Sequence, residues 1–197
     1  MKIIFFDFDG TITIKDSLFD FIQFAVGKQI FFIGLIRLSP MLFSYVFRLL
    51  PKDVAKERLL AYYFKGWDLS RFKEIADYYS LNRIDKIIRP KAIERIRWHQ
   101  AHGDKVVIVS ASLECWLKSW CIKNNINLIS TKFEMEGNIL TGRFSTKNCY
   151  GQEKINRIKE LYNLCDYDQI YAYGDSRGDK EMLNIAHKQY YKYFDRD

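Results

Sequence analysis

The stretch FFDFDGTI at residues 5–12 decides the fold, because an apolar run leads directly into two carboxylates and a glycine. Ile3–Phe6 is continuously apolar, which is typical of a strand covered on both faces. Asp7, Asp9 and Gly10 then interrupt the run with charge and a turn residue. In open parallel sheets, ligands bind beyond the carboxyl ends of the strands. The stretch therefore predicts a strand that places Asp7 and Asp9 at a binding edge.

The second half of the chain alternates between helical and extended patterns, as parallel α/β sheets do. We expect helices over 90–102, 112–123, 155–162 and 182–186, and strands over 106–109, 128–131, 170–173 and 189–193, with a hairpin over 132–144. Ser112 or a neighbour is expected to cap the second of these helices. The pattern predicts an α/β fold: a Rossmann-like parallel sheet with helices on both faces.

Residues 16–88 differ in composition from the rest and read as helical. Leu69, Phe72, Ala76 and Tyr79 recur at the spacing of an amphipathic helix. We expect a helical cap over 16–88, inserted after the first motif into a core formed by residues 1–15 and 89–197.

Further polar residues follow the other apolar strands. Asp175 ends one strand and Asp179 lies four residues on, while Ser110 ends another. Clustered carboxylate and carbonyl oxygens suit magnesium, and a hydroxyl with free amides near a helix start suits an anion. Each feature taken alone is equally typical of turns and helix caps, and Lys154, at a helix start, is typical of an exposed surface.

Taken together, the motifs resemble those of the haloacid dehalogenase superfamily of phosphohydrolases. They are FFDFDGTI at 5–12, VIVSAS at 107–112, GQEK at 151–154 and YGDSRGD at 173–179, in that order across nearly the whole chain. The resemblance implies a Mg²⁺-dependent phosphatase that hydrolyses a phosphate monoester through an aspartyl-phosphate. A carboxylate is a competent covalent nucleophile, and phosphoryl transfer depends mostly on positioning and charge neutralisation.

The resemblance also implies a role for each matching residue. Asp7 is the expected nucleophile, and Asp9 the acid that protonates the leaving oxygen and later the base that deprotonates water. Ser110 and the adjacent amide of Ala111 are expected to bind the phosphoryl oxygens.

The remaining motif residues are expected to neutralise the negative charge of the phosphate. Lys154 is expected between the nucleophile and the phosphate. The resemblance places Mg²⁺ on Asp175, on the Asp7 carboxylate and on the backbone carbonyl of Asp9, with Asp179 holding a metal-bound water or Lys154.

The position of the insertion matches the cap of the phosphoserine-phosphatase-like branch, which favours a small phosphorylated substrate. The sequence departs from phosphoserine phosphatase at Ala111-Ser112, where that enzyme has Gly-Gly, and at Asp16, where it has Glu. Asp16 is expected either to hold an amino group of the substrate or to cap the first cap helix.

The segment Ile30–Leu50 leaves a second substrate class open, because 15 of its 21 residues are apolar or aromatic. Arg37, Pro40 and Arg48 interrupt it, which argues against a transmembrane helix. Residues 27–66 hold seven Lys/Arg against two Asp/Glu, a balance that favours anionic lipid surfaces. The insertion also looks similar to that of bacterial phosphatidylglycerophosphate phosphatases. The alternatives for this segment are peripheral membrane contact with a lipid phosphate substrate, an internal cap core, and the interface of a homodimer.

Composition restricts the remaining classes. The net charge of +7 and the aromatic content of 16% leave a non-enzymatic nucleic-acid-binding protein as a rival, but no basic-aromatic motif supports it, and we expect no nucleic-acid partner. The four cysteines show no paired spacing, so we expect free thiols. The first apolar run is too short for a signal peptide, so we expect a cytoplasmic location, with the inner face of the membrane as the alternative. His99 and His102 are expected on a solvated helix face.

Overall fold

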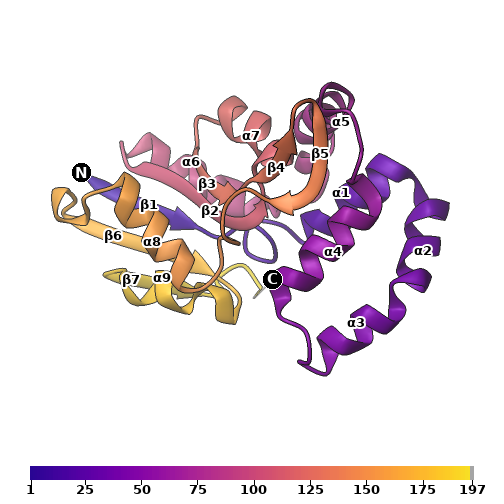
Figure 1. Cartoon of the computed structure of the whole chain (residues 1–197). Coiled ribbons are helices and arrows are strands. Elements are labelled where there is room, and N and C mark those ends of the chain that lie inside the picture. Colours follow the sequence, from indigo (N-terminus) through magenta and orange to yellow (C-terminus); the bar gives the residue numbers. More distant parts are fainter. Residues whose placement is uncertain (196–197) are drawn as a thin grey trace.

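A computed structural model describes residues 1–195, and its centre is a parallel sheet (Figure 1). The strand order is β3-β2-β1-β6-β7, and every neighbouring pair is parallel. The strands are β1 (Lys2–Phe6), β2 (Lys105–Leu113), β3 (Asn127–Thr131), β6 (Gln169–Gly174) and β7 (Lys188–Tyr191). The predicted α/β fold is thereby confirmed.

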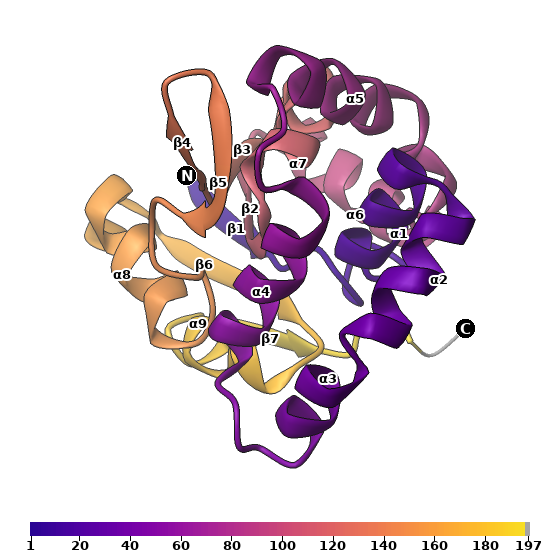
Figure 2. The same ribbon diagram turned by 45° about the vertical axis from the view of Figure 1, so that its right-hand side comes forward.

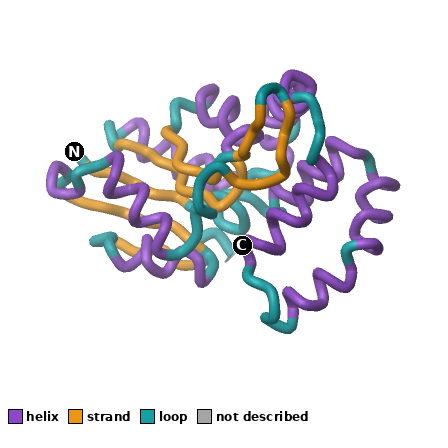
Figure 3. The backbone as a smooth tube through the Cα atoms, viewed as in Figure 1, coloured by secondary structure: helices purple, strands orange, loops and turns teal. Residues whose placement is uncertain are grey.

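Helices cover both faces of this sheet (Figures 1 and 3). On one face lie α6 (Pro90–Ala101) and α7 (Glu114–Lys123), and on the other lie α8 (Gln152–Leu161) and α9 (Lys180–Asn184), with the short turns η2 (Leu164–Asp166) and η3 (Arg177–Asp179). Successive side chains of a strand point to opposite faces, so Ile4 and Phe6 join one apolar cluster while Ile3 and Phe5 join the other. This two-sided burial explains the unbroken apolar run of β1.

The segment between β1 and β2 begins with a helical insertion. Its elements are α1 (Ser17–Val26), α2 (Lys28–Arg37), α3 (Ser39–Val46), α4 (Lys52–Phe64), α5 (Leu69–Asn82) and the turn η1 (Ile84–Lys86). Thr13 and Ile88 form a β-bridge where the chain leaves and returns, close to the expected cap boundaries at 16 and 88. Phe21 of α1 stacks on Trp116 of α7 with 4.5 Å between ring centroids. The insertion and the sheet therefore share one hydrophobic core, and the division of the chain into a cap and a core domain stays a prediction.

A β-hairpin holds α4 in place over the sheet edge. Its strands, β4 (Phe133–Glu136) and β5 (Ile139–Phe144), pair antiparallel around Gly137, whose φ is 60°. At Gly142 a Cβ would lie 2.6 Å from the Cα of Ala61, so only glycine permits this approach of β5 to α4. Figure 2 shows α4 in front of the ends of β1 and β2.

The helices α2 and α3 curve away from the sheet at the right of Figure 1. As predicted, Pro40 marks a break: α2 ends at Arg37, and Pro40 lies in the first turn of α3. Within residues 1–195, no individual helix has the length and apolarity to cross a membrane. The helices α1 and α2 reach the required length and apolarity only when they are taken together, and they are bent by 117° relative to each other.

The expected cap at Ser112 is wrong. β2 continues to Leu113, and α7 begins at Glu114 with no side-chain cap. The Ser112 hydroxyl instead donates to Asp9 Oδ2 at 2.5 Å. A contact between residues 103 positions apart overrides the local capping preference of serine.

The expected solvated position of His99 is also wrong, whereas His102 is exposed. His99 is fully buried, with Nδ1 2.8 Å from Asp104 Oδ2 and Nε2 3.1 Å from the Tyr173 hydroxyl. Burial lowers the pKa of His99 below its ordinary value of 6.5, although the hydrogen bond to Asp104 opposes this.

This burial predicts a stability that falls in acid. Below about pH 6.5 the unfolded chain takes up a proton at His99 that the folded state resists. The free energy of unfolding therefore decreases as the pH falls. His99→Gln removes this proton uptake, and its melting temperature should fall less than that of the wild type between about pH 7.5 and about pH 5.5. The control is His102→Gln, one turn away. Equal acid dependence in all three proteins would contradict the assignment.

Candidate active site

The parallel register brings the predicted strand ends together. Phe6 pairs with Tyr173 of β6 and with Ile108 of β2, and the Asp7 amide donates to the Tyr173 carbonyl at 2.9 Å. The residues that follow these strands therefore meet at one edge. Gly10 makes this approach feasible, because its φ is 83° and a Cβ there would lie 2.4 Å from Asp175 Oδ2.

Lys154 lies buried between two of the predicted carboxylates. Its Nζ donates to Asp7 Oδ1 at 2.5 Å, to Asp179 Oδ1 at 2.6 Å and to the Val109 carbonyl at 2.7 Å. Burial works against its charge, but Asp7 and Asp179 outweigh that effect and raise the pKa of the ammonium. Lys154 is therefore a fixed positive charge at the end of β1, and its expected exposure as a lone surface lysine does not apply.

Asp179 is held in place by the loop after β6. Its Oδ2 accepts hydrogen bonds from the Ser176 hydroxyl at 2.8 Å and from the Ser176 amide at 3.0 Å. Burial opposes ionisation, but Lys154 and these hydrogen bonds prevail and lower the pKa of Asp179. An ionised Asp179 fixes Lys154 beside Asp7, one of the two roles expected for it.

Three carboxylates at this edge fit a divalent cation. Asp7, Asp175 and Asp179 each offer an oxygen, and these oxygens lie within 4.8 Å of one another. Burial raises the pKa of Asp7 and of Asp175, and a neighbouring Asp179 adds to the effect. One ammonium does not balance three carboxylates, and hard oxygen ligands are those that Mg²⁺ prefers. The three carboxylates therefore fit Mg²⁺. The Thr11 hydroxyl donates to Asp175 Oδ1 at 3.1 Å.

Asp9 points its carboxylate toward the helical insertion. It accepts hydrogen bonds from the Ser17 amide at 2.6 Å and from the Ser112 hydroxyl at 2.5 Å. Burial, followed by the nearby Asp16 carboxylate, raises the pKa of Asp9. A carboxyl group with a raised pKa is suited to donate a proton near neutral pH. The expected role of the Asp9 carbonyl in metal binding stays a prediction.

All of the predicted site residues except Asp175 line a cavity of about 240 Å³ between the insertion and the sheet edge. Its lining residues are Asp7, Asp9, Asp16, Leu18, Lys52, Lys56, Ser110, Ala111, Ser112, Tyr150, Lys154, Ser176 and Asp179. The Ser110 hydroxyl accepts from the Ser112 amide at 3.0 Å, deep in this cavity. Asp16 caps α1 by accepting from the Leu18 amide at 2.9 Å, which confirms one of its two expected roles. Asp16 also lines the cavity, and its contact with a substrate amino group stays a prediction.

Sequence reasoning missed the cationic side of this cavity. Lys56 of α4 donates to the Ala111 carbonyl at 2.5 Å, and burial lowers the pKa of Lys56 to about 8. Lys52, one turn earlier, lies 4.4 Å from the centroid of the Tyr150 ring. The i,i+4 spacing of the two lysines shows that they share a helix face. The sequence does not show that this face turns toward the sheet, because β5 sets the orientation of α4.

Comparison with known proteins agrees with this geometry. The family model described as haloacid dehalogenase-like hydrolase matches residues 4–184. Protein CicA of Caulobacter vibrioides is 33% identical over 96% of this chain and 85% of its own length. A probable phosphatase of Mycobacterium tuberculosis is 29% identical over 92% of this chain and 65% of its own length. A substrate-bound phosphoserine phosphatase structure superposes with a TM-score of 0.69 at 14% identity, over 96% of this chain and 85% of that one. The chain therefore belongs to the haloacid dehalogenase-like hydrolase family.

Proposed function

We propose that the protein hydrolyses a phosphate monoester with Mg²⁺, through a phosphoryl group carried on Asp7. The observation that supports this most directly is Lys154, which is buried and held between Asp7 and Asp179 at the base of the cavity. A nucleophile, a fixed cation and a set of metal ligands around one small space are what phosphoryl transfer requires.

The residues present account for both half-reactions. An Asp7 oxygen attacks phosphorus while Asp9 gives its proton to the departing alcohol oxygen, so the phosphorus–oxygen bond of the ester breaks. Asp9 then takes a proton from water, which attacks the aspartyl-phosphate and frees inorganic phosphate and Asp7. Lys154 and Ser110 bind the phosphoryl oxygens throughout. Bound Mg²⁺ would add positive charge next to the phosphate and Asp7.

Two substrate classes fit this cavity. A small phosphorylated metabolite fits its volume of about 240 Å³. A lipid phosphate is the second candidate, favoured by the exposed apolar side chains of α2 and α3 next to the helix that carries Lys52 and Lys56. Both lysines favour a leaving group with a negative charge of its own.

The test is phosphate release by the purified chain with Mg²⁺ and with EDTA. p-Nitrophenyl phosphate reports the chemistry, while phosphoserine and phosphatidylglycerophosphate separate the two substrate classes. We expect release with Mg²⁺ and its loss in EDTA. Absence of metal-dependent release from all three, and from a wider panel of phosphate esters, would refute the proposal.

Asp9→Asn should separate acid–base catalysis from binding. Removing the proton donor should slow hydrolysis of an alkyl phosphate about 100-fold or more, while binding of a phosphate mimic such as beryllium fluoride persists. Steady-state kinetics and mimic binding measure the two effects. Asp53→Asn, an exposed acid on α4, is the matched control. Full activity of Asp9→Asn toward a poor leaving group would refute the acid–base role.

A further inference from the structure

Many of the exposed large apolar side chains among the described residues belong to one segment, residues 28–50, here called the arm. It comprises α2, α3 and the turn that follows. Phe43 is 64% exposed, Phe47 70% and Leu49 78%, and α3 has no buried residue. Of the five aromatic residues in the arm, only Phe31 is buried, where its carbonyl accepts from the Tyr63 hydroxyl. Monomeric proteins in water seldom leave such a surface uncovered.

The charge of the arm identifies the kind of surface that it fits. Lys28, Arg37 and Arg48 are its charged residues, and it contains no Asp or Glu. All three are exposed. Basic side chains among exposed aromatic and aliphatic ones favour an interface that is apolar inside and anionic at its surface.

The directions of the exposed side chains favour lipid over a second copy of the chain as the partner of α3. Tyr45, Val46 and Phe47 are consecutive and all exposed. Successive helical residues differ by about 100°, so Tyr45 and Val46 point in different directions at the end of α3, and the C-cap residue Phe47 follows them. A second copy of the chain would cover one face, whereas lipid surrounds an inserted helix. The Ser44 hydroxyl donates to the Pro40 carbonyl at 3.0 Å, so this polar group needs no water.

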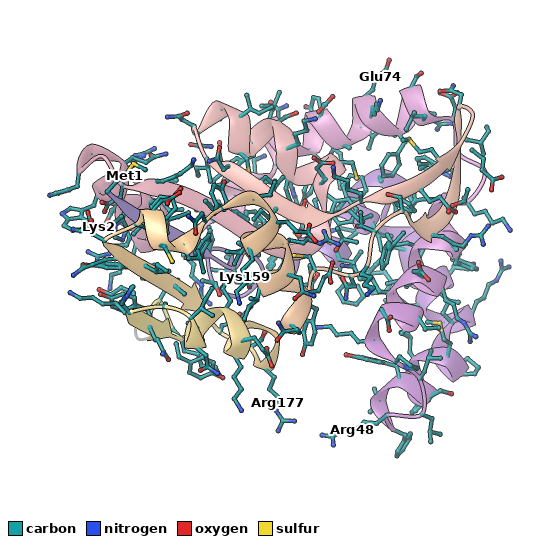
Figure 4. The ribbon with its side chains drawn as sticks, turned by 60° about the vertical axis from the view of Figure 1, so that its left-hand side comes forward. Met1, Lys2, Arg48, Glu74, Lys159 and Arg177 are labelled. Atoms are coloured by element: carbon teal, nitrogen blue, oxygen red, sulfur yellow. The ribbon has the colours of Figure 1, made fainter. Side chains whose placement is uncertain are left out.

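We propose that the arm docks the protein onto an anionic membrane surface, with α3 inserted at the level of the lipid headgroups. The arm lies beside the cavity, because it ends two residues before Lys52, which lines the cavity wall. On the other side of the cavity, Ser176 is followed by the exposed Arg177. Figure 4 shows Arg48 and Arg177 projecting from the same lower edge of the molecule. Docking through the arm thus brings the edge that carries the cavity to the lipid headgroups.

Co-sedimentation with vesicles tests the proposal without reference to catalysis. The wild type should bind vesicles of equal parts phosphatidylcholine and phosphatidylglycerol at low salt. Binding should weaken at high salt, because the Debye length shrinks from about 10 Å at 0.1 M to about 3 Å at 1 M. It should be much weaker with phosphatidylcholine alone. The variant Phe43→Ser/Phe47→Ser should reduce binding about tenfold or more, since it removes two aromatic side chains from the inserted surface.

Matched controls separate docking from general exposure of apolar residues. Ile122→Ser/Leu161→Ser replaces two side chains of similar exposure outside the arm, and it should bind vesicles like the wild type. Both double variants should hydrolyse p-nitrophenyl phosphate like the wild type, because none of the four residues lines the active-site cavity. Absence of binding to every vesicle overturns the proposal, and a dimer that Phe43→Ser/Phe47→Ser dissociates would assign the arm to a subunit interface instead. Equal loss of binding in the control variant would also overturn it.

Discussion

Asp7→Asn is expected to abolish phosphatase activity, with a loss of about 10⁴-fold or more in kcat. The amide keeps the shape of the side chain but does not attack phosphorus. Lys154 keeps two of its acceptors, Asp179 and the Val109 carbonyl, so the site should stay assembled. Because burial raises the pKa of Asp7, its charge is unfavourable in the metal-free fold, and the neutral amide should not cost stability.

Kinetics with Mg²⁺ and thermal melting in EDTA check this pair of expectations. A folded, inactive Asp7→Asn protein is the expected result. Activity within about tenfold of the wild type would contradict the nucleophilic role. An unfolded variant would contradict the electrostatic description of the site.

Lys154→Met should reduce both stability and activity. It leaves the ionised Asp179 buried beside Asp7 without the cation that it pairs with. Breaking a buried ion pair in this way costs about 3–5 kcal/mol, which corresponds to a fall of roughly 10 °C in melting temperature for a chain of this length. Hydrolysis should fall at least about 100-fold, because the phosphate loses its fixed positive charge.

Two further proteins make this result specific. Lys159→Met changes an exposed lysine on the same helix (Figure 4) and should leave melting temperature and activity unchanged. Lys154→Met/Asp179→Asn removes the uncompensated charge as well, so it should recover part of the lost stability while staying inactive. If the double variant is no more stable than Lys154→Met, the stability does not arise from this charge pairing.

The sequence predicted those parts of the fold that depend on local pattern. The apolar runs at β1, β2 and β6 predicted buried parallel strands, and the residues that follow them predicted Asp7, Ser110 and Asp175 at one edge. Pro40 predicted the break between α2 and α3 because proline acts through its own backbone. Each of these signals lies within a few neighbouring residues.

The sequence did not predict features that arise from contacts between distant residues. Ser112 lies in β2, where its hydroxyl donates a hydrogen bond to Asp9. His99 is buried because α6 turns its side chain toward Tyr173 of β6. Lys56 reaches the Ala111 carbonyl only because α4 lies over the sheet edge. No pattern near these residues records their partners, so their positions follow only from the assembled fold.

Trapping the phosphorylated protein tests the central claim most directly. Asp9→Asn, mixed with p-nitrophenyl phosphate and Mg²⁺ and quenched with acid, should carry a phosphoryl group on the peptide that contains Asp7. The p-nitrophenolate group leaves without protonation, so the aspartyl-phosphate still forms, whereas the base that activates water is absent. The group should be labile to hydroxylamine, as acyl phosphates are, and Asp7→Asn should carry none. Metal-dependent phosphate release by the wild type with no acyl phosphate, or with the phosphoryl group on another residue, would contradict the account.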